Sequence, residues 1–315
     1  MPTPPPPARL GLGLAAAGRP AYLTLGRDVD LPGDRSPAAL QARTHALLDA
    51  ATALGVEYVD TARSYGRAEE FLGSWVRETG QTPFVASKWG YRYVGDWRRD
   101  VDVHEVKDHG AAAYEAQLAE TTALLGPWLR LYQVHSLTAD SPLWDDRPLQ
   151  QRMARLRADG VELGFSTSGP AQADAVRRGL ALTVDGAPLF TSVQSTWNLL
   201  EPSAGPALAE AAAAGARVVV KEGVANGRLT DRGADPGSGL ARAARERGVG
   251  VDALALACAL AQPWCSVVLS GAVTVAQLES NAAARDLVAG VGPEEWLQPE
   301  EPAAYWSARS RMGWG

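Results

Sequence analysis

Four side chains that can hold or move a proton stand at the ends of three apolar runs of the sequence. Asp60 closes "VEYVD" and Tyr65 follows it in "DTARSYG", while Lys88 ends "PFVASK" and His135 ends "LRLYQVH". Singly, each has an ordinary explanation, since a strand-end Asp is usually a turn residue and a lone His is usually a hydrogen-bonded core residue. Their repeated position, however, predicts that they meet in one place.

A tyrosine beside a lysine suits proton transfer to a carbonyl oxygen. A free phenol has a pKa of about 10, and a neighbouring ammonium favours the phenolate and lowers that pKa. We therefore expect Lys88 to lower the pKa of Tyr65, and Asp60 to keep Lys88 charged and oriented. Tyr65 is then a general acid for a carbonyl that becomes an alkoxide, and His135 orients or polarises the carbonyl oxygen.

The elements that must carry these residues alternate along the chain. Each apolar run is followed by a polar or glycine-bearing joint and then by apolar residues at helical spacing. The predicted strands are Leu10–Leu14, Val56–Ala62, Pro83–Trp89, Leu129–Ser136, Val161–Ser168, Phe190–Trp197, Ala216–Gly223 and Cys265–Ala272. The predicted helices are Pro37–Leu54, Ala68–Glu78, Ala111–Leu125, Leu149–Ala158, Ala171–Leu180, Pro206–Ala214, Leu240–Arg247 and Val275–Leu287. Glycines suited to a left-handed C-cap follow several of them, at Gly55, Gly80, Gly126, Gly160 and Gly215.

About eight strands in this alternation predict a single parallel (β/α)8 barrel, a TIM barrel, over residues 9–290. In such a barrel the active site is built at the C-terminal ends of the strands, where Asp60, Tyr65, Lys88 and His135 fall. Residues 1–8 are rich in proline and are expected to form a disordered arm. Residues 291–315 are expected to be a tail that packs on or near the barrel, either over the pocket or as a surface strap.

The same residues resemble a known family. "DTARSYG" is similar to the motif D-T-A-x-x-Y-G of the aldo-keto reductase superfamily, and "SKWG" and "YQVHS" stand where that family has its Lys and His. The resemblance runs from Leu10 to about Leu287. It implies NADPH-dependent reduction of an aldehyde or ketone, or the reverse oxidation of an alcohol, on a small-molecule substrate. The catalytic residues that it implies are Asp60, Tyr65, Lys88 and His135.

The resemblance also implies where the cofactor would lie. Implied contacts of the nicotinamide ring and its amide are Ser166, Thr167, Gln194 and Trp197. Those of the pyrophosphate are Lys221, Glu222, Val224, Asn226 and Arg228, and those of the adenosine end are Ser270, Gly271, Ala272, Gln277 and Asn281. Thr167 stands where an Asn is usual, and Trp197 can equally be core filling. Gly271, Val273 and Gln277 replace the basic residues that often bind the 2′-phosphate, so NADH is possible beside NADPH.

Three other interpretations compete with this assignment. "GLGLAA" (Gly11–Ala16) fits the dinucleotide fingerprint G-x-G-x-x-A, but its preceding strand is very short and its helix is interrupted by "GRP", so we assign it to the first barrel strand and its turn. A barrel of this family can also act as a nicotinamide-binding redox sensor or regulatory subunit with little turnover. An aldolase that uses Lys88 as a Schiff base is the third interpretation.

Composition narrows the class of protein. A formal net charge of -6 argues against a nucleic-acid or acidic-membrane surface, because both need clustered Lys and Arg. No run approaches the roughly 20 apolar residues of a membrane helix, and the N-terminus lacks the apolar core of a signal peptide. The two cysteines, Cys258 and Cys265, predict neither a disulfide framework nor a metal site, so a reducing cytoplasmic location is expected. The physiological substrate and the oligomeric state stay open.

Overall fold

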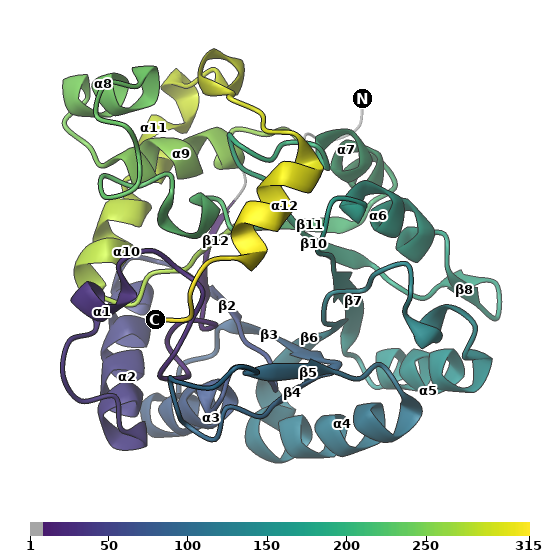
Figure 1. Cartoon of the computed structure of the whole chain (residues 1–315). Helices are drawn as coiled ribbons and strands as arrows, with labels where there is room; N and C mark the ends of the chain where they lie inside the picture. The colour runs from purple at the N-terminus through teal and green to yellow at the C-terminus, as the bar shows by residue number, and fades with distance from the viewer. Residues whose placement is uncertain (1–8) are drawn as a thin grey trace.

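The computed structural model describes residues 9–315, so the proline-rich arm predicted for residues 1–8 lies outside the described part. Eight parallel strands close into a barrel in the order β1-β12-β11-β10-β7-β6-β3-β2, and helices between them form an outer ring (Figure 1). These barrel strands are β1 (Arg9–Gly13), β2 (Tyr58–Asp60), β3 (Phe84–Trp89), β6 (Leu129–Val134), β7 (Glu162–Ser166), β10 (Ser192–Thr196), β11 (Arg217–Lys221) and β12 (Val267–Ser270). The predicted (β/α)8 fold is confirmed.

The helices follow the predicted segments with three additions, and the last predicted segment is divided into two helices. They are α1 (Arg27–Asp30), α2 (Pro37–Ala53), α3 (Ala68–Thr79), α4 (Ala111–Leu125), α5 (Arg147–Ala158), α6 (Gln172–Leu180), α7 (Gly205–Ala213), α8 (Gly239–Glu246), α9 (Val251–Leu260), α10 (Val275–Ala282), α11 (Ala284–Leu287) and α12 (Pro302–Ser310). The additions are α1, α9 and α12, and every residue of α9 is buried. Among residues 9–315, no helix is long and apolar enough to span a membrane.

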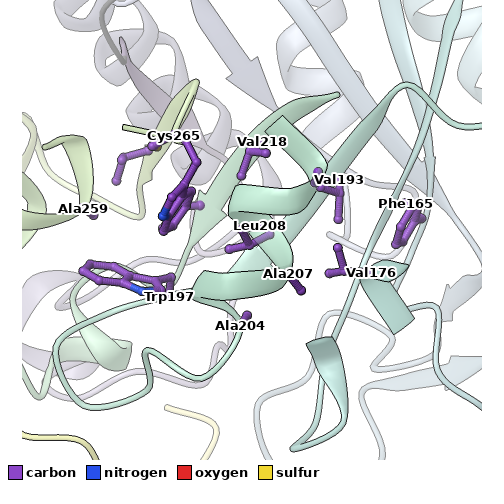
Figure 2. Close-up of a cluster of buried hydrophobic side chains, with 14 of the residues drawn as sticks. Phe165, Val176, Val193, Trp197, Ala204, Ala207, Leu208, Val218, Ala259 and Cys265 are labelled. Atoms are coloured by element: carbon purple, nitrogen blue, oxygen red, sulfur yellow. The ribbon is translucent and has the colours of Figure 1, made fainter. Parts of the chain in front are cut away.

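Along each barrel strand, successive side chains point alternately into the lumen of the barrel and toward the helical layer. One buried cluster, made of Tyr58, Ala86, Leu131, Val219, Val267 and Leu269, contains residues from five strands and fills the lumen. Neighbouring strand residues such as Phe165, Val193 and Val218 belong instead to the cluster under α6, α7 and α9 (Figure 2). Because the side-chain period is two, Asp60, Lys88, Gln133 and Lys221 also point into the lumen, one layer nearer its C-terminal end.

Several connecting elements were not predicted, and those that directly follow a barrel strand lie at the C-terminal end of the barrel, which we call the mouth. The hairpin β4 (Tyr91–Tyr93) and β5 (Glu105–Lys107) follows β3, and a second small hairpin, β8 (Thr183–Val184) and β9 (Ala187–Pro188), follows α6. Short 3-10 turns cover Gly126–Trp128, Pro142–Trp144, Ala225–Gly227, Val288–Gly290 and Pro293–Trp296.

The C-terminal segment, residues 300–315, joins two loops at the mouth. Its helix α12, yellow in Figure 1, lies near the ends of β10 and β11, and Tyr305 accepts a 3.0 Å hydrogen bond from Asn198 just after β10. The chain then reaches the loop after β1, where Leu23 pairs with Trp314 in an isolated antiparallel bridge. The mouth is therefore bordered by this segment as well as by the loops that follow the strands.

Candidate active site

The four sequence-predicted residues meet at the mouth. The ammonium of Lys88 makes an ion pair with Asp60 Oδ1 and donates to the carbonyl of Thr61 at 3.1 Å and to Tyr65 Oη at 3.3 Å. Tyr65 Oη lies 3.5 Å from His135 Nε2. The three bonds use all three protons of Lys88, and Tyr65 accepts one of them. The proton of the phenol is therefore left to be donated elsewhere.

Two glutamines that the sequence argument did not assign to this cluster hold Asp60 in place. Gln133 donates to Asp60 Oδ2 at 3.2 Å and Gln194 donates to the same oxygen at 2.9 Å. Both amides, like Lys88, are completely or almost completely buried, so Asp60 is a buried carboxylate with each oxygen occupied. Gln133 was missed because it is an interior residue of its strand; the alternation two positions beyond Leu131 was the available signal.

The turn that carries Tyr65 is fixed by close backbone packing. Gly66 has a φ of 62°, and a Cβ there would lie 2.6 Å from the carbonyl of Gly18. A Cβ on Gly18 would in turn lie 2.4 Å from the carbonyl of Tyr65, and Arg67 N–H donates to Gly18 O at 2.9 Å. The loop after β1 therefore sets the position of the tyrosine, because neither glycine can gain a side chain without moving the turn.

Burial dominates the electrostatics of these groups. Burial, assisted by the charge of Asp60, raises the pKa of Tyr65 well above its usual value. This is opposite to the expected lowering by Lys88, because the cost of desolvating a phenolate exceeds the attraction of an ammonium that already faces Asp60. Burial also lowers the pKa of Lys88, and burial with the charge of Lys88 lowers the pKa of His135 well below its usual value. The tyrosine is thus a neutral phenol and the histidine a neutral imidazole.

Other residues constrain access to Tyr65. The guanidinium of Arg19 lies 5.1 Å from the centre of the Tyr65 ring and 4.9 Å from that of Trp314, and it is 2.9 Å from Glu105 on β5. Tyr65 is consequently only 8% exposed. A cavity of about 1620 Å³ opens at the opposite end of the barrel, where Tyr58 and Phe84 begin their strands, and none of the four proton-handling residues lines it.

Two of the predicted nicotinamide contacts, Ser166 and Gln194, belong to the polar lining of the barrel. Ser166 Oγ accepts the backbone N–H of Ser136 at 2.8 Å, so its own proton is available to an acceptor. Ser136 follows His135 with a φ of 54°, an uncommon value for a residue with a side chain, and such backbone strain clusters at functional sites. Thr167 is less available, because its hydroxyl is buried against Ser195 Oγ at 2.6 Å.

Trp197 does not lie with these residues. Trp197 follows the inward-facing Thr196, so the alternation of side chains along the strand directs it outward (Figure 2). There its ring centre lies 5.9 Å from that of Trp264, and its indole lies close to Gly205 of α7. Its indole is 3% exposed. The structure therefore places Trp197 in the outer core, which corrects its assignment beside the nicotinamide.

Residues predicted for the pyrophosphate divide between the lumen and the loop after β11. Lys221 points into the lumen because Val219, two residues earlier, lies in the lumen cluster. In the loop, Asn226 donates to Leu23 O at 2.9 Å, and its carbonyl accepts from Leu25 N–H at 3.0 Å. Arg228 is paired with Glu300 of the C-terminal segment. The loop after β11 therefore lies against the loop after β1. Val224 belongs to the loop after β11, between Glu222 and Asn226 in the sequence.

The residues predicted for the adenosine end lie at the end of β12, in the joint that follows it and on α10. Ser270 Oγ donates to Asn281 at 2.6 Å, and Asn281 donates to Asp252 at 2.5 Å. Gln277 accepts the backbone N–H of Val273 at 2.9 Å. Gly271 is exposed and Ala272 is buried beside it. The helix N-terminus, capped by Thr274, is the feature here that suits a phosphate.

Taken together, the donor set fits a nicotinamide cofactor at the mouth. A neutral phenol with a free proton, a neutral imidazole and the available hydroxyl proton of Ser166 converge there, and Gln133 Oε1 is a buried acceptor with no partner among residues 9–315. The fit is poorer along the loop after β11, where Arg228 is already paired with an acid.

Comparisons with known proteins agree with the barrel fold. The family model described as "Aldo/keto reductase family" matches residues 10–289. No curated protein sequence gives a significant match. Among solved structures, the aldo-keto reductase AKR11C1 from Bacillus halodurans (holo form) superposes with a TM-score of 0.65 at 21% identity, covering 96% of this chain and 91% of that one.

Two further solved structures have the same fold. The glycerol dehydrogenase AKR11B4 from Gluconobacter oxydans has a TM-score of 0.65 at 22% identity, covering 99% of this chain and 94% of that one. The putative aldo-keto reductase PA4992 from Pseudomonas aeruginosa has a TM-score of 0.63 at 23% identity, covering 89% and 91%. At these identities the likeness shows the fold, and the family model adds the family. The chain belongs to the aldo/keto reductase family.

Proposed function

We propose that this protein reduces an aldehyde or ketone to an alcohol, or catalyses the reverse reaction, with NADPH or NADH as the cofactor. The observation that carries the proposal is the position of Tyr65 Oη, 3.3 Å from Lys88 Nζ and 3.5 Å from His135 Nε2. Membership of a family of oxidoreductases supports it. When bound, the cofactor supplies the hydride that the protein's own side chains cannot provide.

The four residues have distinct roles in this proposal. Tyr65 donates its proton to the carbonyl oxygen as negative charge develops there. Lys88 donates to Tyr65 Oη at 3.3 Å and so stabilises the phenolate that proton transfer leaves behind. Asp60 holds Lys88 by its ion pair. The four are catalytic residues in the sense that they form one proton-delivery unit at the carbonyl.

His135 would orient the carbonyl. Ser64 Oγ lies 3.4 Å from His135 Nδ1, and a hydroxyl that donates to Nδ1 leaves the imidazole proton on Nε2, beside Tyr65 Oη. A neutral imidazole in that tautomer donates a hydrogen bond to the substrate oxygen without competing as an acid. The low pKa of His135 keeps it neutral.

The proposed cofactor site runs from the mouth to α10. Ser166 and Gln194, with Thr167 beside them, would hold the nicotinamide amide. Lys221, Glu222, Val224, Asn226 and Arg228 would border the pyrophosphate, and Ser270, Gly271, Ala272, Gln277 and Asn281 would border the adenosine. Because Gly271, Val273 and Gln277 carry no positive charge, the 2′-phosphate has no cationic partner at those positions. Both cofactors therefore belong in the test.

The direct test follows the loss of NADPH and NADH absorbance with a panel of aldehydes, ketones and sugars. We expect turnover that needs both the carbonyl compound and the cofactor. Cofactor binding by fluorescence titration without turnover of any substrate would favour the redox-sensor interpretation. A covalent adduct at Lys88 after borohydride treatment, formed without nicotinamide, would contradict the proposal and favour an aldolase.

A further inference from the structure

The cavity at the end of the barrel opposite the mouth is not used by the proposed reaction. It has a volume of about 1620 Å³, and its lining comes from the starts of barrel strands, from the joint after α3 and from the second half of α7. None of the proton-handling residues and none of the residues expected to contact the cofactor belongs to this lining. Its own side chains therefore determine what the cavity can hold.

The charged part of the lining is predominantly cationic. It consists of one glutamate, Glu57, and four arginines, Arg9, Arg130, Arg217 and Arg285, in a protein whose formal net charge is -6. Arg9 pairs with Glu57, but both side chains are largely exposed, so this pair contributes little. Among residues 9–315, Arg285 donates only to backbone carbonyls, and Arg130 has no carboxylate within ion-pair distance. Two positive charges at the rim are therefore uncompensated.

The floor of the cavity combines an aromatic surface with a hydroxyl that has no partner. The rings of Tyr58 and Phe84 stack with 5.1 Å between their centres, and the guanidinium of Arg217 lies 4.6 Å from the centre of the Phe84 ring. Tyr58 is 4% exposed, and neither its Oη nor the Nε of Arg217 has a hydrogen-bond partner in the described part of the chain. A buried donor without a partner costs free energy, which an acceptor from a ligand would recover.

Arg217 keeps donors for a ligand although it has an acidic partner. Its Nη2 lies 3.0 Å and 3.3 Å from the two carboxylate oxygens of Glu162, at the start of β7. A guanidinium has three nitrogens that donate, and this pair occupies only one of them. Nη1 and Nε of Arg217 are therefore left for an anion that enters from the cavity.

We propose that this cavity binds a small aromatic anion, a compound in which a carboxylate, sulfonate or phosphate group is attached to an aromatic body. Arg217 at the floor and Arg130 and Arg285 at the rim would hold the anionic group, and the ring would contact Phe84. A concave surface with charge of one sign concentrates ions of the opposite sign, and an apolar lining with a few convergent polar groups is typical of ligand sites. The inference goes beyond the proposed reaction, because the cavity shares no residue with the candidate active site.

The test uses two dyes that share an aromatic body and differ in charge. Anilinonaphthalene sulfonate carries a sulfonate, and N-phenylnaphthylamine has the same rings without it. Each dye fluoresces when it enters an apolar site, so titration of the full chain gives a Kd for each. Saturating NADP⁺ is present throughout, which keeps the dyes out of the cofactor site. We expect the sulfonate dye to bind the wild-type protein more tightly than the uncharged dye.

Reversing the two uncompensated charges should weaken binding of the anion alone. Arg130 and Arg285 are exposed, so the fold should tolerate Arg130→Glu together with Arg285→Glu. The doubly substituted protein should bind the sulfonate dye about tenfold more weakly, because two exposed ion pairs with the ligand are lost, and the uncharged dye as before. The matched control is Arg155→Glu together with Arg242→Glu, which changes the net charge equally at exposed positions outside the cavity and should leave both Kd values unchanged.

A substitution that strengthens binding separates a ligand site from a loss of fold. Glu162→Gln removes the carboxylate that competes for Arg217, so the sulfonate dye should bind severalfold more tightly. Equal affinity of the sulfonate dye for the wild-type protein and for the Arg130→Glu, Arg285→Glu protein would overturn the proposal. Loss of all dye binding on addition of NADP⁺ would also overturn it, as would binding seen only after residues 1–8 are deleted.

Discussion

The hydroxyl of Tyr65 lies between an ammonium and an imidazole in a largely buried region, where the guanidinium of Arg19 packs on the tyrosine ring. In water the ammonium would lower the pKa of the phenol, but here the cost of desolvating a phenolate is larger. The result is a proton donor that keeps its proton over the whole neutral range. Lys88 then acts mainly after proton transfer, when the phenolate needs a charged hydrogen-bond donor.

This environment predicts a flat pH profile for the chemical step. Because the pKa of Tyr65 is raised well above 10 and that of His135 is lowered well below 6.5, neither group changes protonation between these values. For a neutral aldehyde, neither Tyr65 nor His135 should therefore produce a step in the single-turnover rate of reduction between about pH 7 and about pH 9, and a step near pH 8 would be assigned to Lys221, whose pKa burial lowers to about 8. A fall of kcat through neutral pH would mean that the phenol is acidic, as the sequence argument first suggested.

At the scale of elements, the turn Thr61–Arg67 and the loop after β1 act as one packed unit. Gly66→Ala combines a left-handed backbone with a Cβ 2.6 Å from the carbonyl of Gly18, so it must move the turn that holds Tyr65. We expect it to cost about 2 kcal/mol or more of the free energy of unfolding and to lower kcat. Urea denaturation and steady-state kinetics measure the two effects.

Gly80→Ala is the matched control for that substitution. Gly80 ends α3 with a φ of 69°, close to the value at Gly66, but a Cβ there meets nothing within 4 Å. It should cost only about 1 kcal/mol and leave kcat unchanged. Equal effects of the two substitutions would show that backbone conformation alone matters and that the packing of Gly18 does not position Tyr65.

Much of the element order followed from the sequence, and the exceptions have identifiable causes. Glycines at four predicted C-caps have positive φ values, but Gly126 does not, because Pro127 follows and the chain enters a 3-10 turn with a φ of -35°. The helix α9 was missed because it is buried on all sides and so lacks the polar face that marks an amphipathic helix. Hairpin β4–β5 was missed because each of its strands has only three residues, too few for an alternation to be recognised in the sequence.

The site residues that stand at the ends of strands could be predicted from the sequence. Asp60, Tyr65, Lys88 and His135 stand at or just beyond strand ends, and the closed barrel brings them together. The assignment of Trp197 beside the nicotinamide was wrong because a sequence position near a strand end does not say which way the side chain points. The register of the strand decides that direction, and it is known only once the lumen residues are identified.

At the scale of the whole molecule, the C-terminal segment connects parts of the barrel that are distant in sequence. Arg309 on α12 holds Glu222 after β11, Glu300 holds Arg228 in the same loop, and Trp314 pairs with Leu23 after β1. Burial raises the pKa of Glu222, but Arg309 and Lys221 outweigh it and lower that pKa to about 2. The ion pair between Arg309 and Glu222 therefore holds the C-terminal segment against the mouth of the barrel.

Breaking this pair should destabilise the protein measurably. Arg309→Met leaves Glu222 buried without its main partner, which should cost about 3 kcal/mol of the free energy of unfolding, whereas Arg177→Met breaks the exposed Arg177–Glu210 pair and should cost much less. Since the pKa of Glu222 is depressed when folded, its contribution is present above about pH 4.5 and lost as the pH falls toward about 2. Denaturation curves at several pH values measure this, and a cost equal to that of Arg177→Met would contradict the account.

The most direct measurement of the central claim is the rate of carbonyl reduction by Tyr65→Phe, compared with wild type at saturating cofactor. Removing the phenolic proton should lower kcat by about 100-fold or more, while the Kd of NADPH from fluorescence titration stays the same, because the proton is needed only in the transition state. Wild-type kcat in Tyr65→Phe would contradict the account, since the proton would then come from another group.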